Sequence, residues 1–228
     1  MTVKSKLAVI NNNIAVACEQ SERSPNEVAI IAVTKYVSTE RALEAHDAGI
    51  IHFGENRDDG LTSKWEAFKG QAVWHFIGTL QTRKVKNIID KVSFIHSLDR
   101  LSLAKEINKR ADKQIKCFVQ VNVSGEESKH GINPDEVIPF IEQLSEYQNI
   151  VIVGLMTMAP HTDDSSIPRA CFRKLKHIQI EIAKMKLAHA PCTELSMGMS
   201  NDYLIAIEEG STFVRIGTAL VGEESKEG

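Results

Sequence analysis

Cysteine is sparse in this sequence, and long apolar runs are missing. Four cysteines lie far apart in 228 residues, which is neither the dense framework of a small secreted domain nor a pair of metal knuckles. The N-terminus lacks the unbroken apolar stretch of a secretory signal, and nowhere do about eighteen apolar residues follow one another, as a membrane span requires. We therefore expect a cytoplasmic protein without a membrane span.

An excess of charge of one sign is also missing. Lys and Arg number 27 against 30 Asp and Glu, so the net charge is -3, and the basic residues are scattered. Binding to nucleic acid needs a basic patch, so we expect no nucleic-acid partner. The sequence has no HxxxH pair, paired CxxC or P-loop, and we therefore expect neither a metal site nor nucleoside triphosphate chemistry.

Short apolar runs rich in β-branched residues alternate with longer segments of helical period. Such alternation is typical of parallel strands covered by helices, and eight units predict an α/β fold, a closed (β/α)8 TIM barrel. The expected strands are 28–35, 50–56, 73–78, 92–98, 115–123, 150–158, 192–198 and 212–220. The expected helices between them are 39–48, 58–69, 82–90, 100–111, 134–146, 166–188 and 201–209.

An extra helix is expected before the first strand. Its apolar residues recur every three or four positions over 3–18, and it ends before Ser24-Pro25. The main alternative to the barrel is an open doubly wound sheet, whose first strand is usually followed by a glycine fingerprint. Here the first expected strand ends in Thr34, Lys35 and Tyr36 instead. Because no Pro-, Gly- or Ser-rich linker divides the chain, we expect one domain over 1–228.

Lys35 stands at the end of the first expected strand, and the C-terminal ends of barrel strands are where functional groups gather. Its amine would emerge at the barrel mouth between apolar walls. Desolvation and nearby cations lower the pKa of an amine, which is what a lysine that forms a Schiff base needs. Position alone does not separate this role from that of an ordinary surface lysine.

The loops after the last two expected strands carry groups suited to an anion. Gly198 and Gly217 let backbone amides approach a phosphate, and Ser200 and Thr218 offer hydroxyls. Ser200 also stands where an N-cap would precede a helix that begins near Asn201. The alternative is that the glycines only turn the chain and that Ser200 only caps the helix.

Arg215 interrupts an apolar strand and is expected to point into the barrel mouth, where an unpaired guanidinium is costly. Its expected partner is either Glu55, in a structural ion pair, or a ligand group such as a heterocyclic nitrogen. A lysine, a phosphate cradle and an inward arginine together suggest pyridoxal 5′-phosphate (PLP), whose aldehyde, phosphate and ring nitrogen each require one of them.

Seven segments carry a resemblance to a known family. They are AVTK at 32–35, HFGEN at 52–56, WHFIGTLQTRK at 74–84, VNVSGEESKHG at 121–131, GLMTM at 154–158, LSMGMSND at 195–202 and FVRIGTALVG at 213–222. In this order they closely resemble the YggS/PROSC family of PLP-binding, pyridoxal phosphate homeostasis proteins. The resemblance implies a barrel like the N-terminal domain of alanine racemase, with PLP held as a lysine aldimine.

The resemblance also implies roles for individual residues. Lys35 would form the Schiff base, Asn56 would lie near the cofactor ring, and Arg215 would face the pyridine nitrogen. Ser200, Gly217 and Thr218 would grip the phosphate, with Met199 as a further contact. Many relatives have an aromatic residue where this chain has Arg57, so no role is transferred there. For His75 a packing role is favoured over one as acid or base.

A binding function is expected rather than an enzymatic one. The resembling racemases add a β-domain with a catalytic tyrosine, whereas eight residues follow Leu220 here. An arginine at the ring nitrogen also weakens PLP as an electron sink. We expect a monomer that holds PLP and delivers it to PLP-dependent apo-enzymes. The alternatives are a small PLP-dependent racemase or decarboxylase, and a Schiff-base aldolase for a sugar phosphate.

Overall fold

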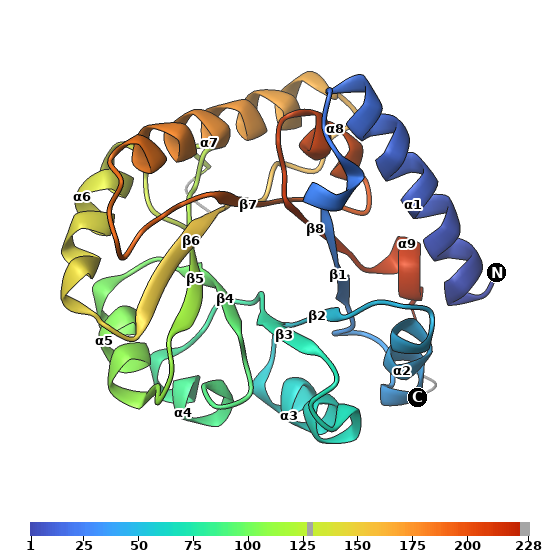
Figure 1. Cartoon of the computed structure of the whole chain (residues 1–228), viewed down its shortest axis with the longest axis horizontal. Helices are drawn as coiled ribbons and strands as arrows, with labels where there is room; N and C mark the ends of the chain where they lie inside the picture. Colours follow the sequence, from blue (N-terminus) through green and yellow to red (C-terminus); the bar gives the residue numbers. More distant parts are fainter. Residues whose placement is uncertain (127–129, 224–228) are drawn as a thin grey trace.

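The computed structural model describes residues 1–126 and 130–223, and at its centre eight parallel strands close into a barrel. Each strand pairs with the next one in the sequence, and the last strand pairs with the first. Helices surround the ring of strands in Figure 1. The expected (β/α)8 barrel is confirmed, and the open sheet is excluded because the strands form a closed ring. Residues 127–129 of the motif at 121–131 lie outside the described residues, as do residues 224–228.

Every strand and helix expected from the sequence overlaps one that is present. The strands are β1 (Ala29–Val33), β2 (His52–Glu55), β3 (Val73–Phe76), β4 (Phe94–Leu98), β5 (Ile115–Gln120), β6 (Ile150–Met156), β7 (Glu194–Met199) and β8 (Phe213–Ile216). The helices are α1 (Val3–Gln20), α2 (Thr39–Asp47), α3 (Asp58–Phe68), α4 (Val85–Ile88), α5 (Leu101–Arg110), α6 (Val137–Gln143), α7 (Ser166–Lys184), α8 (Tyr203–Glu208) and α9 (Thr218–Val221).

All eight strands are shorter than the sequence pattern predicts, and for β1 and β8 the structure shows what ends them at the barrel mouth. β1 ends at Val33 because a turn follows, in which the backbone N–H of Val37 donates to the carbonyl of Thr34. β8 ends before Gly217, whose carbonyl accepts the backbone N–H groups of Leu220 and Val221 and so begins the short helix α9. Residues 218–220 were expected as strand and are helical.

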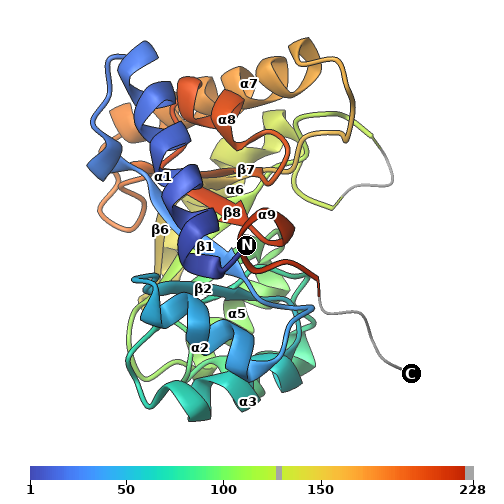
Figure 2. The ribbon, with the colours of Figure 1, turned by 90° about the vertical axis from the view of Figure 1, so that its right-hand side faces the viewer.

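The extra N-terminal helix is confirmed as α1. Its buried side chains are the predicted apolar stripe, namely Val3, Leu7, Ile10, Ile14, Ala17 and Cys18. The helix contacts α8 and α9, and Figure 2 shows it running along the outside of the barrel beside β1. Thr2 caps the helix by accepting the backbone N–H of Ser5.

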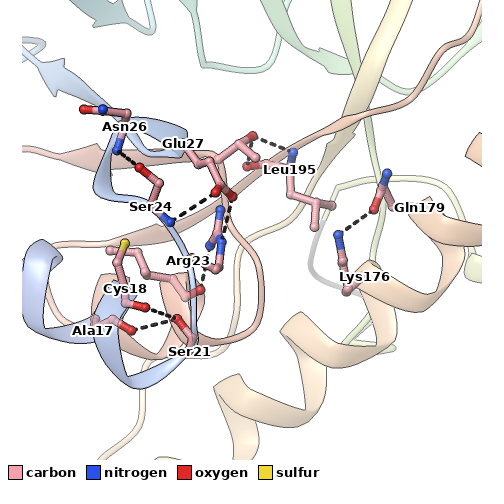
Figure 3. A network of polar contacts seen from close by, with 12 residues as sticks. Ala17, Cys18, Ser21, Arg23, Ser24, Asn26, Glu27, Lys176, Gln179 and Leu195 are labelled. Carbon is pink, nitrogen blue, oxygen red and sulfur yellow. Dashed lines mark hydrogen bonds and ion pairs between the residues drawn. The ribbon is translucent and has the colours of Figure 1, made fainter.

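A small polar network fixes the connection from α1 into β1 (Figure 3). The backbone N–H of Ser24 donates to Glu27 Oε1 at 3.1 Å, and Arg23 Nε donates to Glu27 Oε2 at 3.3 Å. Arg23 Nη1 also reaches the carbonyl of Ile207 in α8, at 2.8 Å. The chain thus enters β1 at a set position, which in turn fixes where Lys35 emerges at the far end of the strand.

Side chains alternate between the inside of the barrel and the layer under the helices, as the period of a strand requires. The inner apolar cluster consists of Ile31, Phe94, Phe118, Met156 and Phe213. A much larger outer cluster joins the sheet to its helices and includes Phe53 and Trp74. All four cysteines are buried, and none of them forms a disulfide within the described residues. Across residues 1–126 and 130–223, no helix has the length and apolar character needed to cross a membrane.

Candidate functional site

A cavity of about 500 Å³ lies at the C-terminal end of the barrel. Its walls come mainly from the loops after β1, β2, β3, β7 and β8. Every residue that the sequence singled out as a binding residue lines it, namely Lys35, Asn56, Met199, Ser200, Arg215, Gly217 and Thr218. Residues from both ends of the chain meet here because β8 closes the barrel against β1, with Ile31 in register with Arg215.

Lys35 lies in the turn after β1 and is exposed at the cavity wall. Its Nζ stands 4.7 Å from the centre of the Tyr36 ring, so the ammonium lies over an aromatic face. Val33, two residues earlier, lines the same cavity. The structure therefore places a primary amine at the mouth of the barrel, on the inward side of β1.

Glu55 does not pair with Arg215, which corrects one of the two partners expected for that arginine. Glu55 Oε1 accepts hydrogen bonds from Lys64 Nζ at 2.7 Å and from Thr34 Oγ1 at 2.6 Å. The alternation of β2 explains the difference. Gly54 faces inward, where an added Cβ would lie 2.9 Å from Ile31, so Glu55 faces outward, toward α3.

Arg215 is buried in the barrel wall beneath the cavity, with 5% of its surface exposed. Its Nη1 donates to the carbonyl and the hydroxyl of Ser196, at 2.8 and 2.6 Å, and Nη2 donates to the carbonyl of Thr157 at 2.9 Å. Burial lowers the pKa of Arg215 to about 10, against the opposing charge of Asp202, so the guanidinium stays protonated at neutral pH. Its remaining N–H donors have no partner among the described residues, and an acceptor in the cavity would satisfy them.

Ser200 and Gly217 bring the two expected anion-binding loops together. The backbone N–H of Gly217 donates to Ser200 Oγ at 3.3 Å. Ser200 is not the N-cap, because α8 begins at Tyr203 and the N-cap position is Asp202, whose Oδ1 accepts the backbone N–H of Met199 at 2.6 Å and makes no capping bond. The helix expected from Asn201 therefore starts two residues later, and the Ser200 hydroxyl remains at the cavity wall.

Gly217 is not required by contacts within the protein. A Cβ added there would meet Val33 at 3.6 Å or beyond, an ordinary van der Waals distance. Because the glycine has no side chain, its backbone is accessible at the cavity wall, beside the Ser200 hydroxyl and next to Thr218. Such a place suits a phosphate, which binds through backbone N–H groups and hydroxyls.

The cavity also has lining residues that were not foreseen, namely Tyr36, Ile77, Gly78, Thr79, Gln120, Met158, Asn201, Gly222 and Glu223. Gln120 could have been predicted, because it is a polar residue at the end of an apolar strand, the same pattern that identified Arg215. Gly78 carried a weaker one. A Cβ there would lie 2.6 Å from the backbone oxygen of Asn56, so the glycine lets the two loops approach each other.

His75 is fully buried and is not among the residues that line the cavity. It hydrogen-bonds with His52 and His96 inside the barrel. Within the part of the chain that the structure describes, no group of three His, Cys, Asp or Glu side chains is arranged to hold a metal ion. The three histidines are neighbours through hydrogen bonds rather than around a common centre.

The chain matches the family model of the alanine racemase N-terminal domain over residues 6–225. Fold and sequence thus place it in the class of barrels that this domain defines. The alanine racemase of Clostridium difficile shares the fold at a TM-score of 0.71 and 16% identity, over 99% of this chain and 58% of the racemase. At that identity the likeness concerns the fold alone.

The nearer relatives belong to one family. The pyridoxal phosphate homeostasis protein of Aquifex aeolicus is 41% identical over 98% of this chain and 99% of that protein. The structure of PipY from Synechococcus elongatus with PLP bound is 31% identical, with a TM-score of 0.83, over 96% of this chain and all of that one, 100%. This chain belongs to the family of pyridoxal phosphate homeostasis proteins.

Proposed function

We propose that the chain is a single barrel domain that binds PLP in the cavity at the C-terminal end of the strands and takes part in PLP homeostasis. The observation that carries the proposal is that three unlike groups line one cavity. They are the amine of Lys35, the Ser200–Gly217 pair and the unpaired donors of Arg215. The names of the relatives and the PLP-bound structure of PipY support the same ligand.

Lys35 is the residue that would hold the cofactor covalently. When bound, PLP supplies an aldehyde carbon with which a primary amine forms a C=N bond and releases water. Among the residues that the structure describes, Lys35 is the only lysine that lines the cavity. Because its side chain is exposed, an amine from a recipient apo-enzyme would have access to the same carbon. Transfer to PLP-dependent apo-enzymes is the part of the proposal that this exposure supports.

Arg215 would donate to the ring nitrogen, and Ser200, Gly217 and Thr218 would hold the phosphate. A guanidinium retains its proton, so the nitrogen that it faces stays unprotonated and the ring withdraws electrons weakly. Asn56 and Met199 would flank the ring. This set binds and orients a cofactor but does little to activate it, which favours a carrier over a racemase or decarboxylase.

We further propose that the protein is monomeric and works in the cytoplasm. The four buried cysteines, which form no disulfide within the described residues, support a reducing compartment. Sedimentation of the protein with and without PLP tests the monomer. A mass of twice 25.3 kDa would contradict it.

The central experiment is borohydride reduction of the protein loaded with PLP, followed by peptide mass analysis. We expect absorbance in the near-visible range that changes on reduction and a single modified peptide that contains Lys35. Lys35→Ala abolishes the covalent product, whereas Lys4→Ala, at an exposed lysine of α1, leaves it unchanged. Modification spread over several lysines, or none at Lys35, would refute the proposal.

A second measurement separates the carrier from the enzyme. The loaded protein is incubated with a panel of L-amino acids, and the products are resolved by chiral chromatography. A carrier gives no more racemisation or decarboxylation than free PLP at the same concentration. Sustained turnover that Lys35→Ala abolishes would replace the carrier with the racemase or decarboxylase alternative.

A further inference from the structure

A continuous chain of hydrogen bonds crosses the inside of the barrel below the cavity. His52 Nδ1 lies 2.9 Å from His75 Nε2, and His75 Nδ1 lies 2.9 Å from His96 Nε2. His96 Nδ1 lies 2.9 Å from Ser196 Oγ, which accepts from Arg215 Nη1 at 2.6 Å. The members come from β2, β3, β4, β7 and β8. We call this set the histidine chain.

The histidine chain extends from the N-terminal end of the barrel strands to their C-terminal end. His52 is the first residue of β2 and is half-buried, and His75 is in register with Gly54, one inward position further along β2. His75 and His96 are completely buried. At the other end, Arg215 lines the cavity. A polar path therefore joins the N-terminal end of the strands to the proposed cofactor site.

The chemistry of the groups sets a direction for the hydrogen bonds. A guanidinium only donates, so the Ser196 hydroxyl accepts from Arg215. Ser196 Oγ has one other partner among the described residues, His96 Nδ1, and must donate its proton there or leave a buried O–H without an acceptor. His96 then carries its proton on Nε2, which donates to His75, and His75 Nε2 donates in the same way to His52.

Burial and nearby cations keep the imidazoles neutral. Burial, reinforced by the charge of Arg215, holds the pKa of His96 well below its ordinary value. Burial does the same for His75, with smaller contributions from His96, His52 and Lys116, and it lowers the pKa of His52 with help from Lys116. The charged groups that act on the histidine chain, Arg215 from β8 and Lys116 from β5, are both cationic.

Aromatic contacts hold the two buried imidazole rings in place. His75 is stacked on Phe94, with centroids 4.4 Å apart and planes at 3°. His96 is stacked on Phe118 at 4.3 Å and 24°. Stacking therefore fixes the plane of each ring, and the hydrogen bonds of its two nitrogens fix its orientation within that plane.

We propose that Ser196 and His96 are positioning residues for Arg215, and that the histidine chain, polarised from Arg215 toward His52, fixes the guanidinium so that its unpaired donors face a ring nitrogen in the cavity. The inference rests on the proposed PLP function. Arg215 also donates to two backbone carbonyls, those of Ser196 and Thr157, which do not depend on the Ser196 side chain. The Ser196 hydroxyl is the one contact that ties its orientation to the histidine chain.

The first test uses the protein without PLP. Nitrogen-15 NMR of the histidine rings at neutral pH is expected to show His75 and His96 each protonated on Nε2 and unprotonated on Nδ1. Ser196→Ala removes the donor to His96 Nδ1, and a mixture of tautomers is expected. A proton on Nδ1 of His96 in the unsubstituted protein would overturn the proposed direction, whether or not PLP binds.

The second test measures PLP affinity, with Ser211→Ala as the matched control. Ser211 is also a fully buried serine beside β7, but its hydroxyl bonds backbone carbonyls such as that of Met197 and does not contact Arg215. We expect Ser196→Ala to weaken PLP binding about tenfold, as for loss of a hydrogen bond to a charged group, and Ser211→Ala to leave it unchanged. Equal affinities of the two variants would overturn the positioning role.

A double-mutant cycle separates positioning from general damage to the barrel. If Ser196 acts through Arg215, adding Ser196→Ala to Arg215→Gln has no further effect on PLP affinity. Independent, additive losses would contradict the inference while leaving the proposed function intact. Failure of the unsubstituted protein to bind PLP would instead refute the proposed function, and the positioning role with it.

Discussion

Lys64 Nζ and Glu55 Oε1 form an ion pair 2.7 Å long, and both side chains are almost entirely buried, with 7% and 2% exposed. The same amine donates to the carbonyl of Thr34 at 2.8 Å. Thr34 immediately precedes Lys35. The ion pair thus fastens α3 to the turn that carries the proposed Schiff-base lysine, from the outer side of the barrel.

Removing one partner of this ion pair is predicted to be costly. Lys64→Met leaves the Glu55 carboxylate buried with Thr34 as its remaining partner. We expect the free energy of unfolding to fall by roughly 3–5 kcal/mol, measured by urea denaturation. The double variant Glu55→Leu, Lys64→Met is expected to recover most of that loss, because no charge is then left unpaired. A double variant as unstable as the single one would show that the pair itself contributes net stability.

Ser200→Ala tests the phosphate end of the cavity. The hydroxyl accepts the backbone N–H of Gly217 and is proposed to donate to the phosphate. We expect PLP affinity to fall about tenfold while the affinity for pyridoxal, which has no phosphate, stays unchanged. Spectroscopic titration with both ligands measures the two effects. An equal loss for both ligands would assign Ser200 a structural role only.

Gly198→Ala tests the turn at the end of β7. Gly198 has a φ of +90°, and a Cβ there would lie 2.5 Å from that of Ala206 in α8. We expect destabilisation of roughly 3 kcal/mol from backbone strain and overlap together. Gly49→Ala is the matched control, because its φ is +109° and nothing lies within 4 Å. Its expected cost is about 1 kcal/mol, from strain alone. Equal costs would show that α8 moves aside freely.

Stability is predicted to fall as the solution becomes acidic. His75 and His96 have pKa values well below 6.5 in the folded protein, chiefly through burial. The unfolded chain, with ordinary histidines of pKa about 6.5, therefore binds more protons below that pH. The free energy of unfolding should be level above about pH 7.5 and decline below about pH 6.5, by up to about 1.4 kcal/mol per pH unit for each histidine.

Urea denaturation between about pH 7.5 and 5.5 measures this slope, a range chosen to lie above the ordinary pKa values of carboxylates. His96→Gln should reduce the slope by between a third and a half, since it removes one of the two fully buried histidines while His52, whose pKa is lowered less strongly, also contributes. His177→Gln is the control, because its side chain is 77% exposed in α7. A slope that His96→Gln leaves unchanged would mean that other groups cause the acid sensitivity.

Periodicity alone predicted the barrel, because the strands are apolar on both faces and α1 has a continuous stripe at helical spacing. Periodicity did not predict where the strands end, because single turns determine those positions. The carbonyls of Thr34 and Gly217 accept turn hydrogen bonds that no apolar pattern encodes. The helix expected at Asn201 begins at Tyr203, after a turn in which Asp202 Oδ1 accepts the backbone N–H of Met199, and no apolar pattern encodes that bond either.

The sequence predicted which residues line the cavity, but it did not predict which side chains contact one another. Strand ends identify Lys35 and Arg215, since the C-terminal ends of barrel strands converge. The partner of Glu55 was not predictable. Glu55 points out of the barrel, and Lys64 of α3 contacts it there. The histidine chain was hidden for another reason. His75 is an isolated histidine in its own strand, and its neighbours become apparent only when the stagger of adjacent strands is known.

The pairing of β1 with β8 has a consequence for synthesis of the protein. Lys35 is made early and Arg215 near the end, yet Ile31 and Arg215 are in register across the seam that closes the barrel. While β8 is still inside the ribosome, Lys35 is already outside, but Arg215 and the Gly217 loop are not yet beside it. The cavity is therefore incomplete until β8 has left the ribosome and paired with β1, so a chain at any earlier stage of synthesis lacks part of the proposed cofactor site.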